Sequence, residues 1–177
     1  TSMAYLDTRK IRNILLVEPW VEDVFVRKIW PPGLHVRIIE KTPVAKWGEG
    51  ALLSSNGAVF KPKRLEDFND LVTLFSPLES PKRVTESFLV TKKFLDRCGI
   101  GIKHFGASDR GEWMVATIDE KAIHLGRGEI TSKLLRFQYA YERELNAYWS
   151  EIERIDLRYP NSLSVDKGQL KETRGLL

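Results

Sequence analysis

The fold is decided by residues 122–159, which read AIHLGRGEITSKLLRFQYAYERELNAYWSEIERIDLRY. In the middle of this stretch, apolar residues recur every three or four positions, a spacing that places them on one face of a helix. These residues are Ile130, Leu134, Phe137, Tyr141, Leu145, Tyr148 and Ile152. Strand patterns flank them at 122–125 and 154–159, and we expect the second strand to resume at 162–165. The stretch therefore predicts strands on both sides of one continuous helix over 130–152.

A second helix and two more strands precede this stretch. Ser80 and Pro81 are a typical helix start, because serine caps the helix and proline at its first position needs no N–H partner. Apolar residues continue at helical spacing to Cys98, and strand patterns follow at 100–107 and 113–118. Helices interspersed with strands that are joined by tight turns predict an α+β fold. We expect a mainly antiparallel sheet with helices packed on one of its faces.

The N-terminal part of the chain predicts a helix and a hairpin. The helix covers 5–17 and ends before Pro19. Alternating apolar residues then predict strands around 24–26 and 34–38. The sequence between them, Trp30-Pro31-Pro32-Gly33, is a strong combination of turn residues.

A domain boundary is predicted at Pro43, because proline is tolerated in a sheet only at edges and strand starts. Beyond it we expect short strands over 44–60, with a hairpin turn at Asn56-Gly57, and a short helix over 65–75. The tail from Asp166 onward is polar and without periodicity, and we expect it to fray.

Charge is unevenly distributed along the chain, whose net charge is +4. Residues 1–64 carry 11 Lys and Arg against 6 Asp and Glu, and the remainder carries 17 against 18. A basic first part is compatible with nucleic-acid binding. So small an excess is explained more simply by a solvated charged surface.

Targeting signals and disulfides are absent from the sequence. The densest apolar run, residues 14–17, is far shorter than the roughly 18 residues of a membrane-spanning helix. We therefore expect any anchor to lie outside this sequence. Cys98 is the single cysteine, which excludes an internal disulfide and a site built from several cysteines.

Groups suited to catalysis or metal binding are few. His35, His104 and His124 lie in or near strand patterns, and neither HExxH nor CxxC spacing occurs. Three carboxylates lie in predicted loops or at strand ends, where solvated acid groups are the ordinary interpretation. They are Asp109, Glu112 and Asp119.

The motif Gly126-Arg127-Gly128 precedes the long helix and has two interpretations. It could present backbone N–H groups to an anion, or it could form a tight turn between strand and helix. By exclusion, the sequence indicates a binding module rather than an enzyme, with no metal or cofactor.

Several motifs along the chain follow one another in a fixed order. They are Glu18-Pro19-Trp20-Val21, Val24-Phe25-Val26-Arg27-Lys28, Trp30-Pro31, the run from Glu40 to Trp47, Leu125-Gly126-Arg127-Gly128-Glu129 and Ile155-Asp156-Leu157-Arg158-Tyr159. Together they cover nearly the whole chain. They resemble the FtsQ/DivIB family of bacterial cell-division proteins, in its Gram-negative FtsQ form.

The resemblance implies a single-pass protein of the inner membrane with its main part in the periplasm, acting at the division septum. It implies that residues 1–43 are the last part of a POTRA domain, 44–165 a β-domain and 166–177 a polar tail. We expect the start of the POTRA domain and the membrane helix to precede this sequence.

The resemblance also implies a non-enzymatic scaffold that binds FtsB, and through it FtsL, by adding a partner strand to the C-terminal edge of the β-domain. Other division proteins would contact the POTRA region, and nucleic acid would not be a partner. A terminal strand leaves backbone groups unpaired, which suits strand addition. Each added backbone hydrogen bond contributes roughly 0.5–1.5 kcal/mol.

Carried over by motif, the site lies between 110 and 165. Tyr159, Asn161 and Ser162 fall on the strand that contacts the partner in the family, and Leu163 and Val165 complete this contact segment. Arg158 and Arg110 match arginines that pair with acidic residues of a partner helix. Two alternatives stay open: Arg110 as a plain loop charge, and Tyr159 as a residue that closes the core.

One position departs from the family pattern. Well-known members carry a tryptophan near the C-terminus where this chain has Lys167, beside Asp166. The departure puts the last partner contacts in doubt. The orientation of the added strand stays open, although antiparallel pairing is commoner.

Overall fold

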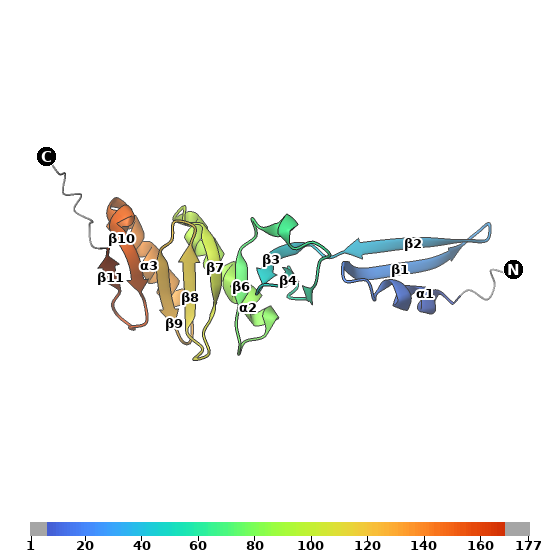
Figure 1. The fold of residues 1–177 in the computed structure, drawn as a ribbon, viewed down its shortest axis with the longest axis horizontal. Helices are drawn as coiled ribbons and strands as arrows, with labels where there is room; N and C mark the ends of the chain where they lie inside the picture. Colours follow the sequence, from blue (N-terminus) through green and yellow to red (C-terminus); the bar gives the residue numbers. More distant parts are fainter. Residues whose placement is uncertain (1–6, 169–177) are drawn as a thin grey trace. The chain divides into compact units, whose positions relative to one another are not determined.

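The computed structural model describes residues 7–168 (Figure 1). The chain forms two compact units, residues 1–69 and 70–177. No helix among the described residues is long and apolar enough to cross a membrane.

The first unit begins with a helix and a hairpin. These are α1 (Thr8–Leu15), β1 (Val21–Ile29) and β2 (Gly33–Glu40), and the two strands pair antiparallel. The helix begins after Asp7, whose carboxylate accepts a hydrogen bond from the N–H of Arg9 at 2.9 Å. Arg12 ties the helix to β1, since it donates to the Val24 carbonyl at 3.0 Å and to the Asp23 carboxylate at 2.8 Å. The predicted helix and hairpin are confirmed. The helix ends at Leu15, earlier than expected, and the start of the predicted range lies outside the described residues.

Three short strands complete the sheets of the first unit. They are β3 (Pro43–Trp47), β4 (Ala51–Ser54) and β5 (Val59–Phe60), paired antiparallel in chain order. The predicted turn at Asn56-Gly57 joins β4 to β5, and Gly57 has the positive φ of 82° that such a turn requires. Trp20, just before the hairpin, packs edge-on against Phe60 with ring centroids 5.0 Å apart. This contact joins the hairpin to the three strands within one unit.

The second unit is a sheet whose strands lie side by side in chain order. They are β6 (Thr73–Phe75), β7 (Ile102–Ala107), β8 (Trp113–Thr117), β9 (Ala122–Gly126), β10 (Ile152–Asp156) and β11 (Ser164–Lys167). The pairs β6–β7 and β9–β10 are parallel, and the other pairs are antiparallel. The expected α+β fold with a mainly antiparallel sheet is confirmed.

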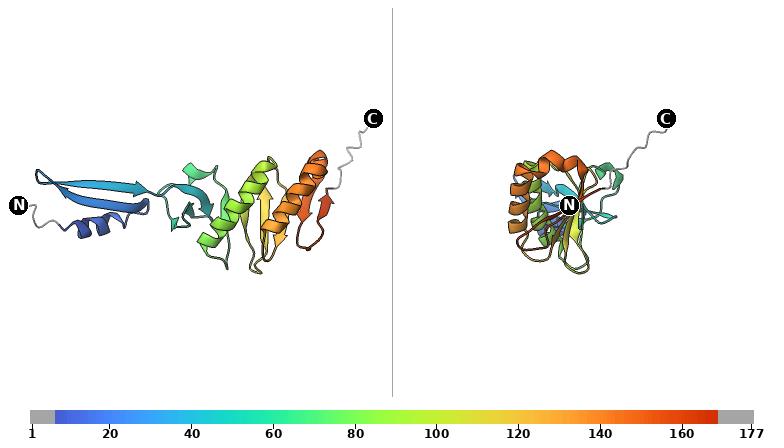
Figure 2. Two further views of the ribbon diagram at one scale, coloured as in Figure 1. Left: turned by 180° about the vertical axis from the view of Figure 1, so that it is seen from behind. Right: turned by 90° about the vertical axis from the view of Figure 1, so that its left-hand side faces the viewer.

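Two helices cover one face of this sheet (Figure 2). They are α2 (Pro81–Arg97) and α3 (Thr131–Arg143), and each connects the two strands of a parallel pair. Ser80 caps α2 as predicted, because its hydroxyl accepts from the N–H of Arg83 at 3.3 Å. Between helices and sheet lies the core, in which the ring of Phe105 stacks on that of Trp113 at 5.3 Å. Phe105 and Phe137 are the largest fully buried side chains.

The second unit consists of one strand pattern used twice. The segment β6–α2–β7–β8 has a parallel pair followed by an antiparallel return strand, and β9–α3–β10–β11 repeats that order. The halves meet where β8 pairs antiparallel with β9. The amino-acid sequence gives no sign of this repeat.

The predicted helix over 65–75 is wrong. Residues Glu66–Phe68 form a single 3-10 turn, and Thr73–Phe75 form strand β6. Leu74 is fully buried, and it pairs with Phe105 in the parallel ladder between β6 and β7. Burial beside the neighbouring strand decides the structure here, and four apolar residues at helical spacing do not outweigh it.

The predicted continuous helix over 130–152 is also wrong in its second half. The α-helix ends at Arg143, Glu144 has non-helical angles (φ −138°, ψ −50°), and a 3-10 helix, η3 (Leu145–Glu151), follows. The chain turns here so that Trp149 packs back against Phe137 and Tyr141 and donates its indole N–H to Asp119 at 2.8 Å. Past the helix end the apolar residues are only partly covered, since Leu145 and Trp149 are half-buried and Tyr148 is 50% exposed.

Candidate functional site

Strand β11 is the outermost strand of the second unit, and its outer side pairs with no strand of residues 7–168. It includes Lys167, so it extends into the segment that was expected to fray. On its inner side the N–H of Gly168 donates to the Glu151 carbonyl at 3.2 Å. Backbone groups point alternately to the two sides of a strand in an antiparallel ladder. The N–H and C=O groups of Val165 and Lys167 therefore point to the open side.

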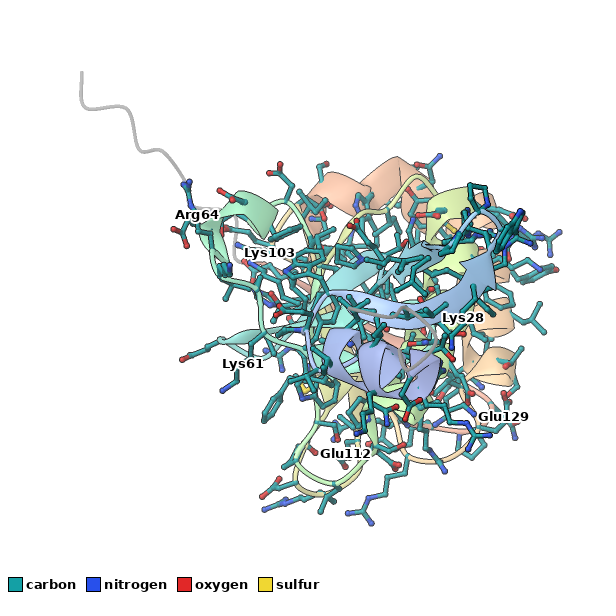
Figure 3. The ribbon with its side chains drawn as sticks, turned by 90° about the vertical axis from the view of Figure 1, so that its right-hand side faces the viewer. Lys28, Lys61, Arg64, Lys103, Glu112 and Glu129 are labelled. Carbon is teal, nitrogen blue, oxygen red and sulfur yellow. The ribbon has the colours of Figure 1, made fainter. Side chains whose placement is uncertain are left out.

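The predicted site residues gather at one end of the sheet. The β7–β8 loop, residues 108–112, and the β10–β11 connection, residues 157–163, both lie there, because β7 and β10 run in the same direction (Figure 1). Carboxylates are also present in this region: Glu112 and Glu129 are labelled in Figure 3. The structure thus brings together residues that are separated by about 50 positions in the chain.

Tyr159 is the most prominent apolar group of the connection. Its side chain is 58% exposed, so the alternative in which it closes the core is wrong. Asn161 and Ser162 are exposed beside it, and Leu163 and Val165 are half-buried. The contact segment is therefore mostly accessible in the isolated chain.

Arg158 is held by its own chain. Its guanidinium binds the Asp156 carboxylate through Nε and Nη2, the shorter contact being 2.6 Å. These hydrogen bonds lower the pKa of Asp156, which stays ionised, against a smaller opposing effect of burial. The aliphatic part of Arg158 lies on Gly126, where a Cβ would come within 2.8 Å of Cγ of Arg158. Arg158 is thus fixed in place, and its Nη1 has no acceptor among residues 7–168.

Arg110 lies in the β7–β8 loop and is exposed. Its backbone N–H donates to the Ser108 hydroxyl at 3.2 Å, while its side chain makes no polar contact with any residue from 7 to 168. The loop precedes Trp113, which pairs with Gly126, the residue beneath Arg158. Arg110 is therefore an uncompensated cation on the same end of the sheet as Arg158.

One residue of this region was not foreseen from the sequence. Arg136 of α3 donates to the carbonyl groups of Leu157 and Tyr159, at 3.1 and 2.8 Å, and to that of Pro160. In the sequence it belongs to the polar face of a helix, which normally faces water. No sequence signal distinguishes it from the other charged residues of that face.

The N–H groups that follow Gly126-Arg127-Gly128, which could have bound an external anion, bind the carboxylate of Glu129 instead. This carboxylate accepts hydrogen bonds from the N–H groups of Thr131 at 2.5 Å and Ser132 at 3.0 Å. The pKa of Glu129 is lowered to about 2, chiefly by a hydrogen bond from the Thr131 side chain and then by the backbone N–H of Ser132. The start of α3 is thus already occupied by an anion of the chain itself.

Groups for catalysis do not converge in residues 7–168. No cluster of three or more His, Cys, Asp or Glu side chains there could hold a metal ion. Burial raises the pKa of the Cys98 thiol to about 11, which disfavours the reactive thiolate. A hollow of about 560 Å³ lies between the starts of α2 and α3, but none of the three candidate carboxylates lines it. Two charged residues that line the hollow are engaged elsewhere. Arg83 pairs with Glu79 at 3.1 Å, and Glu129 binds the N–H groups at the start of α3.

Comparison with protein families gives two matches. The model of the C-terminal region of the cell-division protein FtsQ/DivIB matches residues 45–158, which is more than half of the chain. The chain belongs to the FtsQ/DivIB family. The FtsQ-type POTRA domain matches residues 1–41. The resemblance carried by the sequence motifs is thereby confirmed.

Individual relatives agree with the family match. Cell division protein FtsQ of Cellvibrio japonicus is 28% identical over 160 residues, which cover 90% of this chain and 50% of the relative. FtsQ of Coxiella burnetii is 28% identical over 155 residues, covering 88% and 64%. FtsQ of Actinobacillus pleuropneumoniae is 31% identical over 161 residues, covering 90% and 70%. The chain therefore spans about half to two thirds of the length of these FtsQ proteins.

Lys167, the residue at which a departure from the family pattern was expected, interacts with other side chains of the chain. The ammonium group of Lys167 donates to Glu151 at 3.0 Å and lies 4.5 Å from the centre of the Tyr148 ring. Both partners belong to η3. Lys167 thus ties β11 to the 3-10 helix.

Proposed function

We propose that this chain is a non-enzymatic scaffold of the cell-division machinery that binds FtsB, and through it FtsL, by adding a partner strand to the outer side of β11. The observation that carries the proposal is the open backbone edge of β11 beside the exposed Tyr159. A peptide backbone can satisfy the outward groups of Val165 and Lys167 at roughly 0.5–1.5 kcal/mol for each hydrogen bond. Tyr159 supplies an aromatic anchor next to them.

The repeated strand pattern supports antiparallel pairing. In the first half, the return strand β8 is followed along the sheet by an antiparallel strand, β9. Strand β11 is the return strand of the second half, and the equivalent position beside it is open. A partner strand antiparallel to β11 would continue the same twist and pattern.

The same comparison suggests what the partner strand carries. Val165 lies opposite Ile155 in the second half, as Val115 lies opposite Phe105 in the first. Next to Val115, on the far side, is the fully buried Ile123 of β9. We therefore expect the partner strand to place an aliphatic side chain opposite Val165, on the face that the helices cover.

The charges at this end of the sheet favour an acidic partner. Arg110 has no ion-pair partner among residues 7–168, and Arg158 is only partly engaged by Asp156. Carboxylates on the partner could bind both groups, and exposed charges of this kind act mainly on association rate and specificity.

The wider assignment follows from the family. We propose that residues 1–43 belong to a POTRA domain that contacts other division proteins, that 44–165 form the β-domain, and that 166–177 form a tail. We also propose that the whole protein is anchored in the inner membrane, with this region in the periplasm at the septum.

Nucleic-acid binding is the second candidate, and one feature of the first unit favours it. Phe25, Arg27, His35 and Arg37 are cross-strand neighbours on one face of the β1–β2 hairpin, and Phe25 is 53% exposed. In contrast, Arg64, the last residue of the basic stretch Lys61-Pro62-Lys63-Arg64, pairs with Glu66 and Asp67 at 3.5 and 3.4 Å. Lys61 and Arg64 are labelled in Figure 3. A phosphate-binding surface would give an affinity for mixed oligonucleotides that falls steeply with salt.

The proposal is tested by titrating the chain with a peptide that corresponds to the C-terminal segment of FtsB from the same organism. We expect binding in calorimetry, together with slower amide hydrogen exchange at Val165 and Lys167. A scrambled peptide of equal charge is the control. Absence of binding, or protection confined to the first unit, would contradict the proposed site.

A further inference from the structure

Arg136 binds the segment that carries Tyr159. Its Nη2 atom donates to the carbonyl oxygens of Leu157 and Tyr159, and its Nη1 atom donates to that of Pro160. The donor lies on α3 and the acceptors lie in the β10–β11 connection, 21 to 24 positions further along the chain. One side chain therefore defines the path of the connection.

The carbonyl groups of Leu157 and Pro160 have no other partner among residues 7–168, since no backbone N–H there donates to them. The carbonyl of Tyr159 also begins a turn over residues 160–161. Backbone hydrogen bonding between β9 and the connection ends where Leu157 donates to the His124 carbonyl at 2.8 Å. Without Arg136, the connection between this point and β11 would have little to hold it in one conformation.

Placing the guanidinium of Arg136 here costs free energy, which indicates that its position matters. Nε of Arg136 is buried and donates to no atom of residues 7–168. Lys133, one turn earlier, donates to the carbonyl groups of Leu125 and Arg127 at 2.7 and 2.6 Å. Arg136 thus lies near a second cation, whose pKa is lowered by burial and by the charge of Arg136.

We propose that Arg136 is a positioning residue for partner binding. By fixing three carbonyl groups of the connection, it fixes the exposed side chain of Tyr159 and the point at which β11 begins. The partner then meets a preformed edge and does not have to order it, which removes an entropic cost from binding. This inference rests on the proposed function, because it assigns Arg136 to the same binding edge.

An arginine is required for this task. Its planar guanidinium offers donors in a fixed fork, so that two nitrogen atoms reach three acceptors at once. A lysine keeps the charge and the stem but presents one rotatable ammonium group. Arg136→Lys therefore removes the fork while leaving the charge of α3 unchanged.

The test compares Arg136→Lys and Arg136→Met with Arg143→Met, a change at the exposed end of the same helix. We expect both Arg136 variants to bind the FtsB peptide about tenfold more weakly than the wild type. We also expect faster amide exchange in β11 of the free variants, with unchanged exchange in α2 and β7. Arg143→Met should bind as the wild type does.

A double-variant cycle separates positioning from general stability. If Arg136 acts through the segment of Tyr159, Arg136→Lys should have much less effect in a Tyr159→Ala background than alone. Should Arg136→Met fail to fold, Arg136→Lys decides the question. Wild-type affinity and unchanged β11 exchange in Arg136→Lys would overturn the inference. If the wild type itself does not bind the peptide, the proposed function fails. Amide exchange in the free variants then still tests Arg136: faster exchange in β11 would support its positioning role, and unchanged exchange would overturn it.

Discussion

The carboxylate of Asp156 binds the guanidinium of Arg158 two positions further along the chain, with Nη2 and Oδ2 only 2.6 Å apart. Asp156 also accepts from the backbone N–H of Arg158 at 2.9 Å. Asp156, the last residue of β10, thus fixes the side chain of Arg158. Arg158 is offered to a partner in one orientation.

Replacement of Asp156 by asparagine should make the stability of the chain less dependent on acid pH. The pKa of Asp156 is lowered in the folded state, so its contribution is present above its ordinary pKa of 3.8 and is lost as the pH falls through the folded value. Thermal unfolding of wild type and Asp156→Asn should therefore differ at pH 5–7 and converge below pH 3.8. An equal difference at all pH values would contradict this assignment.

Replacement of Tyr159 by alanine should weaken binding of the FtsB peptide by about 2 kcal/mol, or roughly 30-fold, because an exposed aromatic anchor is removed. The melting temperature should stay unchanged, since the ring is 58% exposed. Tyr139→Ala is a matched control, because Tyr139 is 61% exposed on α3. Calorimetry measures both variants, and equal affinities would remove Tyr159 from the site.

Replacement of Val165 by proline should abolish binding. Proline removes one outward N–H of β11 and leaves the ladder to β10 intact, a position at which a strand tolerates it. Val165→Ala keeps the N–H and serves as the control for the lost side chain, so it should retain most of the affinity. Binding of the proline variant with wild-type affinity would show that the peptide does not add to this edge.

Reversal of the charge at Arg110 should lower affinity most at low salt. Arg110→Glu replaces an uncompensated cation by an anion, and interactions of exposed charges are screened over about 10 Å at 0.1 M salt. Lys93→Glu, on the exposed side of α2, changes the net charge equally and is the control. Peptide association rates measured at 20 and 300 mM salt test this, and parallel salt dependence for all three proteins would exclude Arg110.

Replacement of Glu129 by glutamine should destabilise the second unit by roughly 0.3–1 kcal/mol, with the lower values favoured by its exposure. The pKa of Glu129 is about 2 in the folded chain and 4.5 ordinarily. Its contribution is therefore complete above pH 4.5 and lost between there and pH 2. Urea unfolding at pH 7 and pH 2 measures the difference, which should be present at the first pH and small at the second.

Local signals in the sequence predicted much of the fold. The cap at Ser80, the turn at Asn56-Gly57 and the hairpin around Trp30 are each formed by residues whose own chemistry favours them. The secondary-structure predictions were wrong where contacts between residues far apart in the chain decide the structure. Leu74 is a strand residue because Phe105 lies beside it, and α3 ends at Arg143 because the following segment folds back onto the core.

The proposed site was predictable in part. Tyr159 and Arg158 are marked by a motif, but the strand predicted over 154–159 ends at Asp156, so both residues lie in the connection that follows β10. Arg136 was not predictable, because its role depends on carbonyl groups of a segment more than 20 positions away. The engagement of Lys167 by Glu151 and Tyr148 likewise depends on η3, which the sequence pattern presented as the end of a helix.

The shortness of β11 has a consequence for how long a complex lasts. It comprises Ser164–Lys167, so only a few backbone hydrogen bonds can form along it. At about 1 kcal/mol each they give modest affinity, and residence time would depend on the aromatic and charged contacts at its start. Such an attachment can be made and released repeatedly. The same shortness, with charged Asp166 and Lys167 in the strand, discourages copies of the chain from sticking to one another edge to edge.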